Sequence, residues 1–278
     1  MVRLFGPLVG LFFAVALLWS FGIGAYTAAT DPSPPSAEAL FVEHPKHVEF
    51  SFDSAFGTFD KAQLQRGFKV YQEVCSACHS LKQVAFRDLA ALGYNEAEVK
   101  AIAKNWASKA QTFDPKTGDR GERPNLPADH FPAVYYAGQG VPPDLSLITK
   151  SRHGGAQYVH SLLTGYAEQV GYKNEKGQEL LKMFPDAKTP DGLYFNPYFA
   201  NLNLAMPAPL VSDDQVAYTD GTKATVEQMS KDVSAFLTWT AEPKLDKRKQ
   251  TGWPVLGFLV FATALAYLAK RNVWADKH

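Results

Sequence analysis

The sequence predicts a mainly α-helical protein in which one domain with long loops lies between two apolar terminal helices. Three observations predict this fold: apolar runs near both ends, helical periodicity in several internal segments, and stretches rich in proline and glycine. The 278 residues carry 28 Lys+Arg and 28 Asp+Glu, so the formal net charge is zero. Length and composition suit one sizeable domain with one or two segments left for a membrane.

The first predicted element is an N-terminal hydrophobic helix. An uncharged apolar run covers residues 4–28 and is long enough to cross a bilayer, but no clean A-x-A cleavage site follows it. We therefore expect residues 1–29 to be a signal peptide or a retained transmembrane anchor that exports the rest of the chain. Residues 30–48 begin with several prolines and are expected to form a linker.

Four helices are predicted within the globular domain, which we place at residues 49–243. Three of them show apolar residues three or four apart and begin with a capping-box pattern, and the fourth is a short helix after Gly154 and Gly155. The predicted helices start near Asp60, Asn95, Gln157 and Thr225. The last one ends at Pro243, because proline cannot continue a helix.

Gly67 lies on the first of these helices and has two explanations. It either permits close contact with another helix or is merely tolerated at a cost in helix propensity. Residues 112–143 and 193–210 show no sustained periodicity and are predicted to be long loops.

The five residues from Cys75 to His79 carry the strongest chemical signal. In C-x-x-C-H, two thiols can add to the vinyl groups of a haem while the adjoining imidazole reaches the iron. A zinc site would need further ligands at motif spacing, but the chain holds only two cysteines. A redox pair normally follows a strand in a βαβ pattern, which is not seen here. The motif predicts one covalent haem c, attached through Cys75 and Cys78, with His79 on the iron.

The second axial ligand decides between electron transfer and chemistry at an open iron position. Met206 stands in a loop stiffened by two prolines, which could hold a thioether against iron, so it is the favoured candidate. Met229 lies on the apolar stripe of a helix, where a core methionine is expected, and Met183 has no distinctive context. His153 and His160 are expected to have surface or hydrogen-bonded roles.

Arg152 is a candidate partner for a haem propionate. Buried carboxylates need cationic or hydrogen-bonding partners, and an arginine supplies both. An ordinary surface arginine explains this residue equally well from the sequence.

The end of the chain predicts a membrane anchor. A basic stretch at residues 244–250 precedes an uncharged run at 251–269, which can span a bilayer as a helix, and 270–278 form a short tail. Trp253 and Trp274 are expected to mark the membrane interfaces. Basic residues flank both ends of the run and do not orient it. Bacteria attach c-type haem outside the cytoplasm, so we expect an inner-membrane protein with a periplasmic haem domain and a cytoplasmic C-terminus.

Charge is unevenly distributed along the chain. Between Leu4 and Ala241 there are 20 Lys+Arg against 25 Asp+Glu, so this region carries about −5. A mildly acidic domain favours a basic protein partner and repels nucleic acid, which we do not expect to be bound.

Several longer segments resemble the cytochrome c1 family, the haem c subunit of quinol:cytochrome c oxidoreductase, also called the cytochrome bc1 complex. The similarity runs in order from about residue 50 through the C-terminal anchor. The segments that carry it are 66–79, 142–146, 152–155, 162–166, 192–199, 205–207 and 239–243.

This resemblance implies a class I cytochrome c-like helical haem domain and a set of seven haem-contacting residues. They are Cys75 and Cys78 as thioether attachments, His79 and Met206 as axial ligands, Arg152 near a propionate, and Pro143 and Tyr158 lining the pocket.

The resemblance also implies a role in electron transfer. The chain would accept electrons from the Rieske iron-sulfur protein and pass them to a soluble or membrane-tethered cytochrome c, with its anchor beside cytochrome b in a dimeric complex. Quinol oxidation would belong to cytochrome b, so no catalytic residue is assigned, and the chain acts in an enzyme only as a subunit. The alternatives are a membrane-anchored cytochrome c serving another oxidase or reductase, a peroxidase-like enzyme, and an assembly anchor.

Overall fold

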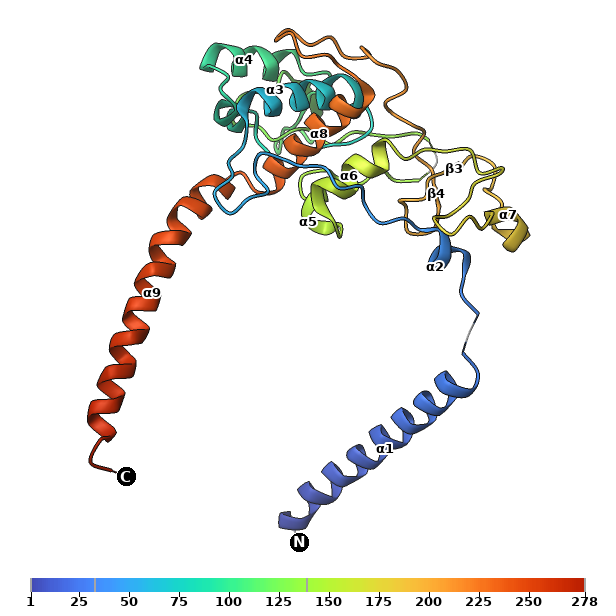
Figure 1. The fold of residues 1–278 in the computed structure, drawn as a ribbon. Coiled ribbons are helices and arrows are strands. Elements are labelled where there is room, and N and C mark those ends of the chain that lie inside the picture. The colour runs from blue at the N-terminus through green and yellow to red at the C-terminus, as the bar shows by residue number, and fades with distance from the viewer. Residues whose placement is uncertain (1, 33, 139, 278) are drawn as a thin grey trace.

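The computed structural model of the chain describes residues 2–32, 34–138 and 140–277. The predicted N-terminal helix, linker and C-terminal tail each include one residue outside these ranges. The described residues are mainly helical, as Figure 1 shows. They also form two short two-stranded sheets. In chain order the elements are α1 (Val2–Thr30), α2 (Ala37–Phe41), α3 (Lys61–Val70), the π-helical turn η1 (Tyr71–Cys75), the 3-10 helix η2 (Phe86–Leu92), α4 (Glu96–Asn105), β1 (Ala110–Phe113), β2 (Arg120–Arg123), α5 (Ile148–Ser151), α6 (Gly155–Leu163), α7 (Leu180–Met183), the 3-10 turn η3 (Pro185–Ala187), β3 (Tyr194–Phe195), β4 (Asn203–Leu204), α8 (Val226–Ala241) and α9 (Leu245–Trp274).

The crossing of α3 and α8 is the centre of the domain. A Cβ atom added at Gly67 of α3 would lie 2.1 Å from the backbone oxygen of Asp232 on α8, so the two helices touch backbone to backbone. Only glycine permits this approach. Of the two explanations for Gly67, close helix contact is therefore the right one.

A buried carboxylate reinforces the crossing. Asp232 is fully buried on α8 and accepts hydrogen bonds from Arg66 Nε at 2.8 Å and Gln63 Nε2 at 3.1 Å, both on α3. Gln228 Nε2 also donates to it at 2.8 Å. A buried carboxylate requires this degree of pairing.

Only one of the three predicted capping boxes forms, because two of the glutamines predicted to close a box bind Asp232 instead. Asn95 and Glu98 form a reciprocal box at the start of α4, as predicted. Asp60 caps α3 through the backbone N–H of Ala62, but Gln63 does not return the bond because its side chain reaches the α8 carboxylate instead. Thr225 caps α8, whereas the Gln228 side chain turns to the same carboxylate.

Aromatic side chains fill the core beside the crossing. The α3 ring Phe68 and the neighbouring Tyr71 each lie within 6.5 Å, centroid to centroid, of one ring just after α4, one on α8 and one in a loop. The partner rings are Trp106, Phe131 and Phe236. Aromatic pairs at these distances stabilise a core beyond the area that they bury.

The predicted long loops contain short regular elements that the sequence did not indicate. Strands β1 and β2 form an antiparallel hairpin at the start of the predicted 112–143 loop, and β3 pairs with β4 within 193–210. The β1–β2 strands are mainly exposed, so they lack the apolar alternation that marks a strand in sequence. The remainder of both segments is largely irregular, as predicted.

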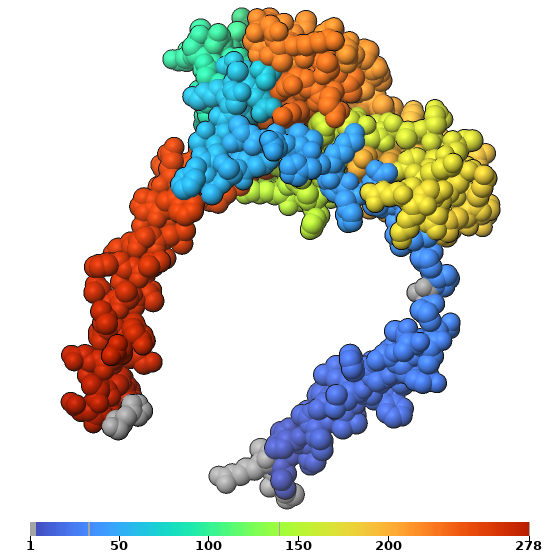
Figure 2. Space-filling model, viewed as in Figure 1, coloured from blue at the N-terminus to red at the C-terminus, as the bar shows by residue number. Residues whose placement is uncertain are grey.

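The second half of the predicted linker packs on the domain. Phe41 of α2 is buried in a separate apolar cluster with Leu180, Phe195 and Leu202. The backbone N–H of Lys46 donates to Ser161 Oγ at 2.8 Å. Figure 2 shows this part of the chain, in blue, lying across the domain surface. The stretch between α1 and the packed chain is therefore only a few residues long.

Helices α1 and α9 project from the domain in Figures 1 and 2. Leu4–Thr30 and Leu245–Trp274 are long and apolar enough to cross a membrane, and neither apolar window is buried by the rest of the chain. Helix α9 begins at Leu245, so most of the predicted basic linker at 244–250 is helical and continuous with the predicted membrane span.

Candidate haem-binding site

The C-x-x-C-H motif forms a tight turn directly after α3. The helix widens into the π-turn η1, where Ser76 N donates to Tyr71 O at 2.8 Å. The backbone N–H groups of Cys78 and His79 then both donate to Cys75 O, at 3.1 and 2.9 Å. Single π-turns often occur at functional sites. The turn places both cysteines and the histidine next to the end of the buried α3 helix.

The two cysteines are half-buried free thiols. Burial, and to a lesser degree Cys78, raises the pKa of Cys75 to about 12. Reactive redox cysteines instead have lowered pKa values, so this environment does not favour a thioredoxin-like pair. The described residues include no group of three or more His, Cys, Asp or Glu side chains that could hold a metal ion. The zinc alternative therefore has no support in this part of the chain.

The imidazole of His79 is held by the carbonyl oxygen of Pro143. His79 Nδ1 lies 2.8 Å from Pro143 O, and because a carbonyl only accepts, Nδ1 carries the proton. Burial lowers the pKa of His79, and the Pro143 bond opposes that effect only in part. The ring is therefore neutral with its Nε2 lone pair available, the form in which histidine binds metals.

Asp144 connects the Pro143 segment to the motif. Its Oδ2 accepts from Ser80 Oγ at 3.0 Å and from Lys82 N at 2.8 Å, while Oδ1 accepts from Ser146 N at 3.0 Å. Sequence reasoning gave Asp144 no role of its own. The Pro-Asp-x-Ser pattern, which is typical of an Asx-turn, was the signal that could have identified it.

Met206 lies in the loop after β4, half-buried against the same apolar core that Cys75 and Tyr158 contact. The hydroxyl of Tyr166 donates to the backbone oxygen of Met206 at 2.9 Å. Tyr166 lies just after α6, so a helix end positions this loop. The sequence did not indicate that Tyr166 positions this loop. Its only signal was its place in the 162–166 segment that resembles the family.

Arg152 and Tyr158 lie close to each other. Arg152 is exposed at the end of α5, and Tyr158 is half-buried on α6. Burial raises the pKa of the Tyr158 hydroxyl, whereas the positive charge and hydrogen bond of Arg152 act in the opposite direction. The Arg152 guanidinium and the Tyr158 hydroxyl are therefore close enough to bind the same polar group.

His153 and His160 lie in the surface or hydrogen-bonded settings expected of them. His160 is buried on α6 with Nε2 3.3 Å from Glu227 Oε1, and burial lowers its pKa. His153 is exposed. Met229 is fully buried in the α8 core and Met183 is 42% exposed.

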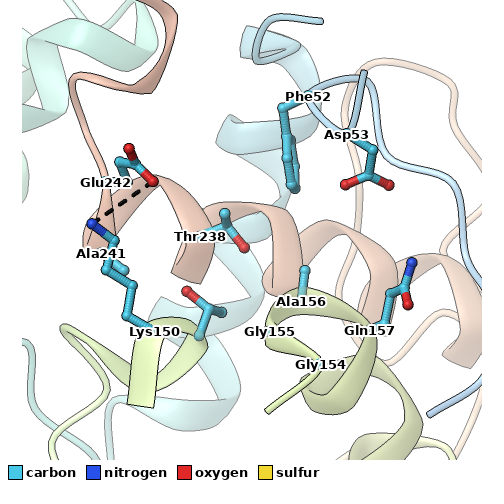
Figure 3. A pocket seen from close by; sticks show the side chains of 11 residues that line it. Phe52, Asp53, Lys150, Gly154, Gly155, Ala156, Gln157, Thr238, Ala241 and Glu242 are labelled. Carbon is cyan, nitrogen blue, oxygen red and sulfur yellow. Dashed lines mark ion pairs between the residues drawn. The ribbon is translucent and has the colours of Figure 1, made fainter. Parts of the chain in front are cut away.

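A cavity of about 370 Å³ lies between α5, α6, the end of α8 and residues 52–53, next to the chain segments that carry Arg152 and Tyr158. Figure 3 shows the ion pair at its edge between Lys150 Nζ and Glu242 Oε2, which are 3.7 Å apart. None of the seven predicted haem-contacting residues lines this cavity.

The residues present fit a covalently attached haem. Two free thiols share one turn with a neutral histidine whose Nε2 is available. Cys75, Tyr158 and Met206, from distant parts of the chain, border one apolar core. A flat apolar macrocycle with an iron centre needs this combination of attachment, ligand and apolar surroundings.

Comparison with known proteins decides the family. A family model described as "Cytochrome C1 family" matches residues 50–277. The chain belongs to the cytochrome c1 family.

Relatives across bacteria and fungi agree with this assignment. The chain is 44% identical to "Cytochrome c1" of Rhodospirillum rubrum, over 83% of this chain and 88% of the relative. It is 38% identical to "Cytochrome c1" of Blastochloris viridis, over 96% of both chains. It is 41% identical to "Cytochrome b-c1 complex catalytic subunit, mitochondrial" of Candida albicans, over 83% of this chain and 77% of the relative.

Proposed function

We propose that this member of the cytochrome c1 family carries one covalent haem c on Cys75 and Cys78, with His79 and Met206 as axial ligands. Family membership makes the chain an electron-transfer subunit of the cytochrome bc1 complex. The observation that carries the proposal is the motif turn, in which both thiols are free and Pro143 fixes the proton of His79 on Nδ1.

The haem, when bound, supplies a one-electron centre, and His/Met ligation favours a relatively high reduction potential. The chain's own residues orient and enclose that centre. Pro143 fixes the His79 ring, Asp144 holds the Pro143 segment in place, and Tyr166 holds the Met206 loop. Arg152 offers a positive charge to a propionate. If His79 and Met206 both bound the iron, no iron position would be left for a substrate, and charge transfer is the chemistry that the haem would supply here.

The proposed setting is the inner membrane of a bacterium. Helix α9 crosses the bilayer, with the haem domain in the periplasm and the C-terminus in the cytoplasm, and α1 is a signal peptide or a second anchor. The electron donor is a Rieske iron-sulfur protein and the acceptor a cytochrome c. Cytochrome b is the neighbour of α9 in a dimeric complex. Supporting this neighbour, a relative in Bradyrhizobium diazoefficiens is named "Cytochrome b/c1", and this chain is 43% identical to it over 36% of its length.

Purification in mild detergent tests the proposal. We expect the haem to stay attached to the chain during denaturing electrophoresis, because thioether bonds survive denaturation, and we expect Cys75→Ser to weaken that attachment. The reduced spectrum of the unmodified protein is expected to be low-spin and unchanged by carbon monoxide. It co-purifies with a cytochrome b and an iron-sulfur subunit. A colourless polypeptide or ready binding of carbon monoxide contradicts the proposed site, and co-purification with oxidase subunits alone contradicts the proposed complex.

A further inference from the structure

The start of α9 is joined to a loop almost 200 residues earlier in the chain. Lys249 Nζ donates to the backbone oxygens of Ser54 at 2.7 Å and Gly57 at 3.3 Å, and also to that of Phe52. Trp253 Nε1 donates to Ala55 O at 3.4 Å. The loop at residues 51–57 and the first turns of α9 therefore form one unit, and the loop keeps a fixed height along the helix.

An exposed aromatic pair lies at this junction. The Phe56 ring stacks on the Trp253 ring with centroids 4.9 Å apart and planes 20° apart. Phe56 is nevertheless 77% exposed and Trp253 is 45% exposed. Covering an exposed phenylalanine ring with apolar material is favourable because it removes apolar surface from water, so a nonpolar neighbour is expected.

The loop cannot withdraw this ring into the domain. A Cβ atom at Gly57 would lie 2.3 Å from Ser51 O, so the two ends of the loop are already in close contact. The same loop is fastened by the three carbonyl bonds to Lys249. Phe56 is therefore held outward by a compact, well-bonded turn.

The position of Trp253 indicates what covers the pair. The exposed basic residues Lys244 and Lys247 precede it, and the uncharged run that can cross a membrane begins at Thr251. A tryptophan just inside such a basic-to-apolar boundary is typical of the headgroup level of a bilayer. Since Phe56 stacks on Trp253, it lies at the same level.

We propose that the 51–57 loop rests on the membrane surface, with Phe56 inserted beside Trp253 at the boundary between lipid headgroups and acyl chains. This inference rests on α9 crossing the membrane, as proposed above. A helix alone permits the domain to tilt, whereas a helix and a loop touching the bilayer together restrict its orientation. The 51–57 loop thus sets the orientation of the haem domain above the membrane.

Depth-dependent fluorescence quenching tests this contact. Both native cysteines are consumed by haem attachment in the holoprotein, so Phe56→Cys provides a single thiol for a bimane label. The full-length chain is placed in nanodiscs of phosphatidylcholine and phosphatidylglycerol that contain nitroxide lipids, labelled at the headgroup or at the middle of the acyl chain. We expect label 56 to lose about half of its fluorescence to headgroup nitroxide and less to the acyl-chain nitroxide.

Three further labels make the outcome decisive. Ala55→Cys replaces Phe56→Cys if that chain fails to take up haem, and the same pattern is expected. Val211→Cys is the control, because Val211 is 72% exposed and its segment is bonded, through Val226 N and Asp213 Oδ1, to the first residue of α8, at the end of that helix away from α9. We expect no quenching there. Val260→Cys, in the middle of the predicted span, reports whether α9 crosses the bilayer and is expected to respond to acyl-chain nitroxide.

The two possible failures are distinguishable. If label 260 is not quenched, the proposed membrane anchoring is wrong. If label 260 is quenched and the loop labels are not, the anchoring stands and the loop contact is wrong. The measurement is repeated in the assembled complex. The signal from labelled complex that lacks the introduced cysteine is subtracted as background. Loss of lipid quenching at the loop there means that another subunit covers Phe56, which also overturns the inference.

Discussion

At the scale of single residues, the most informative side chain is Met206, because it is the only proposed iron ligand outside the motif. We expect Met206→Leu to remove the far-red sulfur-to-iron absorption band and to lower the reduction potential by on the order of 100 mV, since a thioether stabilises ferrous iron. Met183→Leu and Met229→Leu are the controls and should leave the band unchanged. Met229 is fully buried, so its variant tests for a packing effect on the spectrum. A far-red band that persists in Met206→Leu contradicts the ligand assignment.

Asp144 is the second residue whose role can be measured. Burial, the largest influence, raises its pKa, but hydrogen bonds from Ser146, Lys82 and Ser80 together outweigh burial and hold the pKa below the usual 3.8. We expect Asp144→Asn to lower the free energy of unfolding by about 1–2 kcal/mol at pH 7, because an amide cannot accept all of these bonds.

The pH dependence of the Asp144 contribution has a definite sign. A carboxyl group whose pKa is lower in the folded state stabilises the fold above its unfolded pKa and loses that contribution as the pH falls. The difference in unfolding free energy between the parent and Asp144→Asn should therefore be constant above about pH 5 and shrink as the pH falls below it. Denaturant titrations at several pH values measure this difference. A difference that grows on acidification contradicts the role given to the carboxylate.

At the scale of helices, the contact between α3 and α8 is the feature most sensitive to substitution. We expect Gly67→Ala to lower the free energy of unfolding by about 3 kcal/mol, because the added Cβ meets the backbone oxygen of Asp232, which cannot rotate away. Thermal unfolding followed by loss of the low-spin haem spectrum provides the measurement. Gly252→Ala is the matched control in another helix. A Cβ atom added there meets no atom outside its own stretch of helix within 4 Å, so this variant should change the free energy of unfolding by less than about 1 kcal/mol. Equal effects at the two glycines are not compatible with close helix contact.

The helices were largely predictable from the sequence, and their boundaries follow from local chemistry. Side chains at Asp60, Asn95 and Thr225 each cap the helix that was predicted to start there. The capping box at Asp60 was wrong because a distant partner, the buried Asp232, competes for Gln63. Tertiary competition of this kind has no signal within a window of a few residues.

The site residues also fall into two groups, those that local sequence predicts and those that depend on distant contacts. The motif cysteines and His79 are contiguous in sequence, so local spacing is enough to predict their chemistry. The orientation of His79 depends on Pro143, and the Met206 loop depends on Tyr166, contacts that span 64 and 40 residues. Short elements such as the exposed β1–β2 hairpin were missed because they bury too little apolar surface to produce a periodic pattern.

At the scale of the whole molecule, charge separates along the chain. The region from Leu4 to Ala241 carries about −5, and positive charge is concentrated beside the predicted membrane span. Basic residues at 244–249 match the anionic headgroups of a bilayer, whereas the acidic domain suits a basic soluble partner. The part of the chain beside the membrane and the haem domain therefore have different electrostatic surroundings, and the encounter of the acidic domain with a diffusing partner should respond to salt.

The salt response of electron transfer follows from this distribution. We expect the second-order rate of reduction of a basic cytochrome c to fall roughly tenfold as ionic strength rises from about 0.01 to 0.3 M, because salt screens long-range attraction between opposite charges. Stopped-flow kinetics with the purified complex measure this rate, and an uncharged small oxidant serves as the control whose rate should stay nearly constant. An acidic acceptor should show the opposite trend, with a rate that rises as salt screens repulsion. A flat response with the basic cytochrome means that the acidic balance of the domain does not steer its partner, and docking then depends on short-range contacts alone.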